Sequence, residues 1–182
     1  MKYTVIIVSF LVAAVSLKAE VVLTFGDPEE FADFQYAQTR RTITTEFFAR
    51  EVMVYLERAV EKVLTEGVVL ALDFQDIDLA CGFEPWQFIP LNDVRFYKSR
   101  YPPKAKFTYR LEDGDGNVLV EGDQALREPS YQARFSRSTG VTEPFYYERR
   151  MLERWIKIDL LKEVKQAAVA QGLPPSYTSG ET

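Results

Sequence analysis

The chain contains no histidine and only one cysteine, and both shortages limit the chemistry that it can perform. Histidine is the usual general base near neutral pH and the commonest metal ligand. Its absence excludes a Ser-His-Asp triad, a Cys-His pair and an ordinary catalytic zinc site. The lone Cys81 excludes an intramolecular disulfide. Carboxylates, lysine or tyrosine could still support catalysis. The sequence shows no complete catalytic set, however, and we predict no catalytic residue, metal site or cofactor.

Long apolar runs are also scarce, and the one strong example lies at the N-terminus. A charged start precedes an apolar run from Val5 to Val15, and Ala19 is a small residue at a plausible cleavage position. This pattern is typical of a secretory signal peptide, here over residues 1–19. The run is too short for a membrane helix, which needs roughly 20 apolar residues. An uncleaved anchor is the alternative, but no stop-transfer flank follows the run.

Cleavage after Ala19 would place Glu20 at the new N-terminus, where lipid attachment would need a cysteine. Leu17 lies at the third position before this cut and is bulkier than usual, so a site a few residues away stays open. We therefore predict a periplasmic protein that makes no stable membrane insertion once the leader is removed.

Basic residues are outnumbered in this chain. It has 22 Lys and Arg against 27 Asp and Glu, a formal net charge of −5. The leader holds Lys2 and Lys18 and no acidic residue, so its removal lowers the net charge to −7. Because phosphate binding needs a surplus of basic residues, we expect no nucleic-acid partner. We predict one domain over residues 20–171 and a disordered tail over residues 172–182.

Hydrophobic periodicity predicts two long helices, over residues 43–66 and 143–170. For the second helix, Thr142 is a candidate N-cap, and Pro144 lies near the first turn, where proline is tolerated. Shorter segments with alternating apolar residues predict strands. These segments are residues 20–25, 68–79, 94–98, 104–112 and 118–124.

Two details of strand pairing follow from the same pattern. The apolar alternation changes phase near Gln75, which predicts a β-bulge there. The run Asp-Gly-Asp-Gly-Asn over residues 113–117 predicts a hairpin turn between the last two strands. A calcium loop is the alternative, but Val118 stands where such a loop requires glycine, and Gln124 where it requires a bidentate glutamate.

The predicted order is therefore β-α-β-β-β-β-α. Several neighbouring strands with few helices favour the α+β class. We predict a two-layer sandwich, in which a mainly antiparallel sheet of about five strands carries two long helices on one face.

Acidic residues gather near the end of the second predicted strand. Asp76 and Asp78, with Glu84 nearby, could bind a hard cation or act as an acid/base pair. We prefer to interpret them as a polar strand face, where a neighbouring residue such as Arg95 offsets their repulsion. A calcium site needs about six to eight oxygen ligands, and no complete set is visible. The other candidates for binding are Arg95 and Trp86. Trp86 lies in a loop rich in proline and aromatic residues, and exposed aromatics favour recognition.

Two carboxylates, Glu148 and Asp159, fall inside the apolar arc of the last predicted helix. A carboxylate that faces a core costs several kcal/mol unless it is paired or protonated. We predict that these side chains form buried ion pairs with a sheet arginine such as Arg95 or Arg110. The alternative is a proton-active carboxylate in an apolar setting.

Several segments match a known family in the same order. They are residues 76–86 (DIDLACGFEPW), 93–95 (DVR), 101–103 (YPP), 109–118 (YRLEDGDGNV) and 143–155 (EPFYYERRMLERW). Over about Val21 to Trp155 the chain resembles the secreted bacterial family catalogued as domain of unknown function 3016. The resemblance implies a proteobacterial envelope protein and implies no reaction or ligand. Cys81 departs from the family as an insertion or a substitution beside the glycine that the family has there.

These observations favour a non-catalytic periplasmic protein that binds, or helps to assemble, an envelope protein or ligand that the sequence does not identify. The alternative is a carboxylate-based hydrolase or a divalent-cation-binding protein that uses Asp76, Asp78 and Glu84.

A calcium titration followed by the melting temperature separates these two hypotheses. Because no complete set of oxygen ligands is visible, we expect calcium and other divalent metals to leave the melting temperature unchanged. A marked stabilisation by a divalent metal would instead favour the cation-binding alternative.

Overall fold

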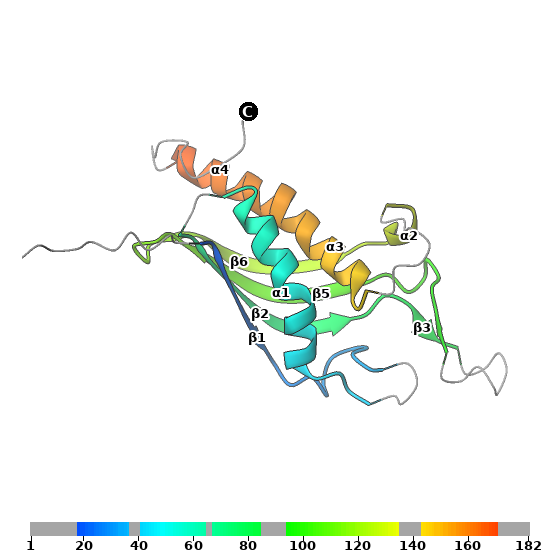
Figure 1. Ribbon diagram of the computed structural model, residues 1–182. Helices are drawn as coiled ribbons and strands as arrows, with labels where there is room; N and C mark the ends of the chain where they lie inside the picture. Colours follow the sequence, from blue (N-terminus) through cyan, green and yellow to red (C-terminus); the bar gives the residue numbers. More distant parts are fainter. Residues whose placement is uncertain (1–17, 37–40, 65–66, 85–93, 135–142, 171–182) are drawn as a thin grey trace, which may run out of the picture.

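The structure is a computed structural model that describes residues 18–36, 41–64, 67–84, 94–134 and 143–170. The strands are β1 (Glu20–Phe25), β2 (Val69–Asp78), β3 (Gly82–Phe83), β4 (Arg95–Phe96), β5 (Lys104–Glu112) and β6 (Val118–Arg127). The helices are α1 (Thr45–Glu61), α2 (Tyr131–Arg134), α3 (Tyr146–Trp155), the π-helix η2 (Ile156–Leu160) and α4 (Leu161–Ala170). The α+β class is confirmed (Figure 1).

The main sheet has four strands in the order β1-β2-β5-β6. β1 pairs with β2 in parallel, because α1 lies between them in the chain as a crossover, and the other neighbours are antiparallel. The prediction of about five mainly antiparallel strands is therefore corrected. The predicted strand over residues 94–98 shortens to β4, which pairs with β3 in a separate sheet. Cys81, at a φ of 74°, lies between β2 and β3 and turns the chain away from the main sheet.

The predicted β-bulge is confirmed, because the register of β2 against β5 shifts between Phe74 and Asp76. The extra residue, Gln75, is exposed, whereas Phe74 and Ile77 are both buried. The bulge therefore lets one strand keep its apolar residues in the core on both sides of the phase change. The predicted hairpin is also confirmed, as β5 and β6 pair from Lys104 to Glu112.

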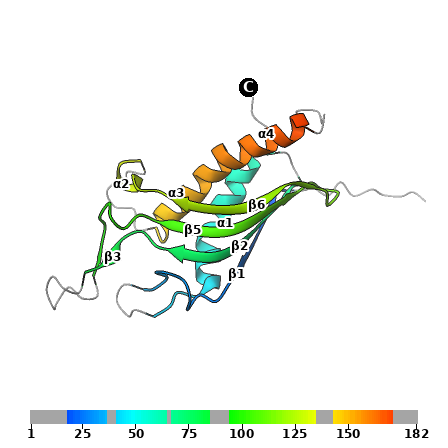
Figure 2. The same ribbon diagram turned by 180° about the vertical axis from the view of Figure 1, so that it is seen from behind.

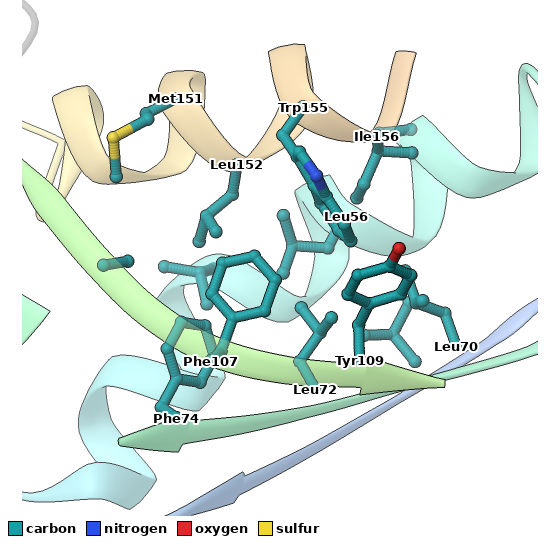
Figure 3. Packing of buried hydrophobic residues seen from close by; sticks show 14 of the residues in the cluster. Leu56, Leu70, Leu72, Phe74, Phe107, Tyr109, Met151, Leu152, Trp155 and Ile156 are labelled. Carbon is teal, nitrogen blue, oxygen red and sulfur yellow. The ribbon is translucent and has the colours of Figure 1, made fainter. Parts of the chain in front are cut away.

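The core lies between the sheet and the long helices. Phe48 of α1 contacts Phe74 of β2, with ring centroids 6.1 Å apart. Trp155 of α3 contacts Phe107 of β5 at 5.0 Å, and Phe74 and Phe107 are register partners. Figure 3 shows Trp155 pointing at the sheet above Phe107 and Tyr109. Fully burying such an aromatic side chain stabilises the fold by about 1.5–3 kcal/mol.

The C-terminal helical segment begins later than expected. It runs as α3, η2 and α4 from Tyr146 to Ala170, whereas its predicted start was residue 143. Phe145 is the N-cap residue and has a left-handed φ of 51°, so Pro144 lies directly before the cap. This backbone places the Phe145 ring against Phe48, 4.9 Å away. The predicted cap Thr142 lies outside the described residues.

Polar residues cover the other face of the sheet. Its exposed residues include Lys106 and Arg110 of β5 and Glu121 and Asp123 of β6. Figure 2, which views the molecule from behind, shows this face of the sheet. Among the described residues, no helix has both the length and the apolar character needed to cross a membrane.

Tyr109 connects the sheet to α4. Its hydroxyl donates a hydrogen bond to Glu163, and its ring lies edge-on to Trp155 at 5.1 Å. Burial, followed by the Glu163 carboxylate, raises the pKa of Tyr109. The register partner of Tyr109 on β6 is Gly122, and a Cβ there would lie 3.0 Å from the tyrosine oxygen. Glycine at this position therefore leaves room for the tyrosine side chain.

We predict that Gly122→Ala destabilises the fold by about 1 kcal/mol, because the anchored Tyr109 ring must move to admit a methyl group. Gly114→Ala is the matched control in the same hairpin, since its Cβ would meet only Gly67 O at 3.5 Å. Chemical denaturation of both variants tests this. Equal stabilities for the two variants would contradict it.

Candidate ligand-binding pocket

A pocket of about 390 Å³ lies where the end of β2, the turn after it, β4 and the start of α3 meet. Its apolar and aromatic walls are Leu79, Ala80, Tyr97, Phe145, Tyr146 and Tyr147. Its polar residues are Cys81, Arg95, Glu143 and Glu148. Mostly apolar walls with a few polar groups are typical of small-molecule sites, which span about 300–1,000 Å³. We call this cavity the Glu148 pocket.

Glu148 lies in the first turn of α3 and is only 5% exposed. Its Oε1 accepts a hydrogen bond from the Ala80 N–H at 2.5 Å. In the part of the chain that the structure describes, no Lys or Arg nitrogen lies within ion-pairing distance of its carboxylate. Burial therefore raises the pKa of Glu148, although the Ala80 hydrogen bond and the charge of Arg95 oppose the shift.

The burial of Glu148 agrees with the sequence, but the predicted ion pair was wrong. Arg95 is engaged by another carboxylate, and Arg110 pairs with Glu112 and Glu121 on the exposed face of the sheet. Glu148 instead lies buried beside aromatic side chains, with no direct counter-ion in the described part of the chain.

Arg95 lies in the pocket wall with its guanidinium fully engaged. It makes a bidentate pair with Asp33, at 3.0 Å and 2.8 Å. It also donates to the carbonyl oxygens of Cys81 (2.9 Å) and Gln35 (3.1 Å), and it lies over the Phe83 ring at 4.9 Å. Because planar bidentate pairs are among the stronger ion pairs, the charge of Arg95 is already neutralised by Asp33.

Glu143, the second acid of the pocket, is also neutralised. Arg149 Nη2 lies 2.5 Å from Glu143 Oε2. The Arg149 guanidinium is buried over the Tyr55 ring at 3.6 Å, which fixes α3 against α1. With Arg95 balanced by Asp33 and Glu143 by Arg149, Glu148 is the pocket group whose charge has no direct counter-ion among the described residues.

Cys81 and Phe145, two residues that line the pocket, have left-handed backbones, with φ values of 74° and 51°. Such conformations cost non-glycine residues about 1–3 kcal/mol and are frequent at binding sites. The Cys81 thiol is buried, and its sulfur accepts a hydrogen bond from Arg95 Nε at 3.1 Å. Burial raises the pKa of this thiol although Arg95 opposes the shift, so the sulfur is not an activated thiolate.

The predicted acidic cluster does not form one site. Asp76 accepts a hydrogen bond from the Ala32 N–H at 2.8 Å, which holds the loop before α1 against β2. Asp78 pairs with Lys104 of β5 at 2.5 Å. In the described segments, no three Cys, Asp or Glu side chains are grouped closely enough to hold a metal ion.

Glu84, the third acid of the predicted cluster, is fully buried. It pairs with Lys98 at 2.6 Å and with Arg100, and it accepts a hydrogen bond from the Tyr101 hydroxyl at 3.1 Å. These three residues follow β4, so Glu84 ties the β3–β4 sheet to the next segment. Its contacts indicate a structural role.

The remaining predicted residues lie elsewhere. Trp86 falls outside the described residues. Asp159 lies half-buried in η2, and it makes no ion pair with any residue that the structure describes, so its predicted burial and pairing were wrong. The π-helical turn moves it away from the apolar face that a regular helix would give it.

Sequence reasoning missed most of the pocket wall. Phe145, Tyr146 and Tyr147 form a run of aromatic residues directly before Glu148, at the start of a helix. This run was the available signal. Tyr97 gave no comparable signal, because only the folded chain brings it to Tyr147, at 5.6 Å between ring centroids.

We predict that Glu148→Gln is at least as stable as the wild type at pH 7. Glutamine can still accept the Ala80 hydrogen bond, but it has no charge to bury. Because folding raises the pKa of Glu148, the folded state binds more protons than the unfolded state above the ordinary glutamate value. The wild type should therefore lose stability relative to the variant as the pH rises from about 4.5 through the raised pKa.

Chemical denaturation between pH 4 and pH 8 tests this pH dependence. Glu148→Ala is the control that removes the acceptor, and it should cost about 1–3 kcal/mol because the Ala80 N–H loses its partner. A loss of about 3–5 kcal/mol in Glu148→Gln at pH 7 would instead indicate a broken buried ion pair.

Comparison with known proteins adds a family but no activity. A crystal structure of a minor lipoprotein from Acinetobacter baumannii is similar over 90% of this chain and 98% of that chain, at 12% identity and a TM-score of 0.23. That score is too low to support an argument. No curated protein matches the chain. The family described as "Protein of unknown function (DUF3016)" matches residues 19–158, which is well over half of the chain. The resemblance seen in the sequence is thus confirmed, and the chain belongs to the DUF3016 family.

Proposed function

We propose that the mature chain is a non-catalytic binding module of the bacterial envelope, and that the Glu148 pocket is its ligand site. The observation that supports this most directly is a buried carboxyl group, without a counter-ion among the described residues, in an aromatic-walled cavity of about 390 Å³. Ligand sites combine such walls with a few converging polar groups, and ionisable groups with shifted pKa values gather at them.

The position of β1 is compatible with secretion. A cut after Ala19 would leave β1 intact, because this strand begins at Glu20, whose N–H donates to Val68 O at 2.9 Å. Ala19 itself is buried in the folded chain, so a peptidase would have to act before folding. The proposal therefore places cleavage during export, and the folded domain in the periplasm.

Binding is favoured over catalysis by the chemistry of the pocket. The Cys81 sulfur is buried, and its raised pKa disfavours the thiolate that a nucleophile needs. Glu143 is occupied by Arg149, so it is not available as a second carboxylate beside Glu148. The alternative hydrolase or cation site at Asp76, Asp78 and Glu84 gains no support, because the three carboxylates have separate partners.

A fragment screen by NMR tests the proposal. We expect some members of a mixed set of cationic, neutral and anionic fragments, at millimolar concentration, to shift the backbone amides of Ala80, Tyr97 and Tyr147. Tyr97 is 49% exposed and lines the pocket, so Tyr97→Ala should weaken binding with little loss of stability.

Tyr36→Ala is the matched control, because Tyr36 is a partly exposed tyrosine outside the pocket wall. The proposal is overturned if no fragment shifts the three pocket amides. It is also overturned if Tyr36→Ala weakens binding as much as Tyr97→Ala does.

A further inference from the structure

We propose that the Glu148 pocket takes an organic cation, an ammonium group on a small apolar body, with the Glu148 carboxylate as its counter-ion. This inference rests on the proposed function, since it names the class of ligand for the same site.

The charges around the pocket point to a cation. Arg95 is neutralised by the bidentate Asp33, and Glu143 by the buried Arg149. Glu148 is held by a neutral N–H donor and has no Lys or Arg partner among the described residues. One added positive charge would therefore balance the site, and it would remove the main cost of ionising a buried carboxyl group.

The walls suit an organic cation better than a metal ion. Tyr97 and Tyr147 bring two rings to 5.6 Å of each other at the pocket, and Tyr146 also lines it. Aromatic faces attract ammonium groups, and quaternary ammonium ligands are commonly bound in this way. A hard metal ion needs several oxygen ligands, and the described acids are not grouped to supply them.

The groups that line the pocket disfavour an anionic ligand. The guanidinium of Arg95 already donates to Asp33 and to two carbonyl oxygens, so it offers little to a second acceptor. An anion would also approach the carboxyl groups of Glu143 and Glu148. A neutral ligand could accept a hydrogen bond from protonated Glu148, but it would leave the carboxyl group without a counter-ion.

The pH dependence of affinity separates a cationic from a neutral ligand. Below its raised pKa, Glu148 must release a proton before it can pair with a cation, so affinity for a cation should rise by up to about tenfold per pH unit and then level off. A neutral ligand that accepts a hydrogen bond from the protonated carboxyl group would bind more weakly as the pH rises.

Other ionisable groups face this site, and several elements supply them. They are Asp33 from the loop before α1, Asp78 from β2, Cys81 from the turn, Arg95 from β4, Tyr97, Tyr131 from α2, and Glu143, Tyr147 and Arg149 from the start of α3. Burial raises the pKa values of Cys81 and Tyr131, so both groups remain neutral through the acidic range. The acids Asp33, Asp78 and Glu143 are paired with Arg95, Lys104 and Arg149. Glu148 is therefore the acid of this set that has no basic partner among the described residues.

Choline and 3,3-dimethylbutan-1-ol test the inference, because they share a shape and differ in charge. Both are titrated into the mature protein between pH 4.5 and pH 8, and the amides of Ala80 and Tyr147 are followed by NMR. We expect choline to bind about tenfold more tightly than the alcohol above the raised pKa, with an affinity that rises with pH.

Two variants complete the experiment. Glu148→Gln should lose about tenfold in choline affinity and keep its affinity for the alcohol, with its fold checked by thermal melting. Asp159→Asn is the matched control, because it also removes the charge of a carboxylate in the same helical segment. Like Glu148, Asp159 makes no ion pair with the described residues, but it lies outside the pocket. It should leave choline binding unchanged.

The outcomes distinguish this inference from the proposed function. The cation inference is overturned if the alcohol binds as tightly as choline, if choline affinity falls as the pH rises, or if Glu148→Gln binds choline like the wild type. It is also overturned if only neutral or anionic fragments shift the pocket amides, and in that case the binding function stands. If no probe or fragment shifts them, both proposals fail.

Discussion

The pairing of Arg95 with Asp33 determines the character of the pocket. Arg95 is the described arginine whose charge most affects Glu148, and it engages Asp33 with two hydrogen bonds instead. The same guanidinium holds the carbonyl oxygens of Gln35 and Cys81, so it joins the loop before α1 to the turn after β2. Because Asp33 neutralises Arg95, Glu148 is buried with no counter-ion in the segments that the structure describes. A direct pair between Arg95 and Glu148 would have given Glu148 a counter-ion.

The strained backbone positions lie at the same pocket as the Glu148 carboxyl group. Cys81 and Phe145, the two described non-glycine residues with positive φ, both line the pocket. Each is held by packing or hydrogen bonds, since Cys81 binds Arg95 and Tyr101 through its backbone and Phe145 packs on Phe48. Strain that persists at a cavity, and not across the rest of the described fold, is the distribution expected where the surrounding structure holds a binding site in place.

Periodicity in the sequence was enough to locate the bulge at Gln75, the β5–β6 hairpin and the two long helical segments, because these depend on which residues must reach the core. It could not predict which charged side chains pair with one another. That Arg95 binds Asp33 and not Glu148 depends on a loop whose path no local pattern encodes. Asp159 was misplaced because a π-helical turn changes the angle per residue, and periodicity assumes a regular helix.

The fold alone does not require an acid at residue 148. The fold requires an acceptor for the Ala80 N–H, and glutamine would supply one without the cost of burying an ionisable group. Unlike that amide, a carboxyl group can ionise. In an empty pocket we expect that ability to lower stability, because the charged form has no direct counter-ion among the described residues. It becomes favourable when a positive charge enters, so the bound cation and the folded state should stabilise each other by the same free energy. The instability that Glu148 introduces is therefore coupled to the binding that we assign to it.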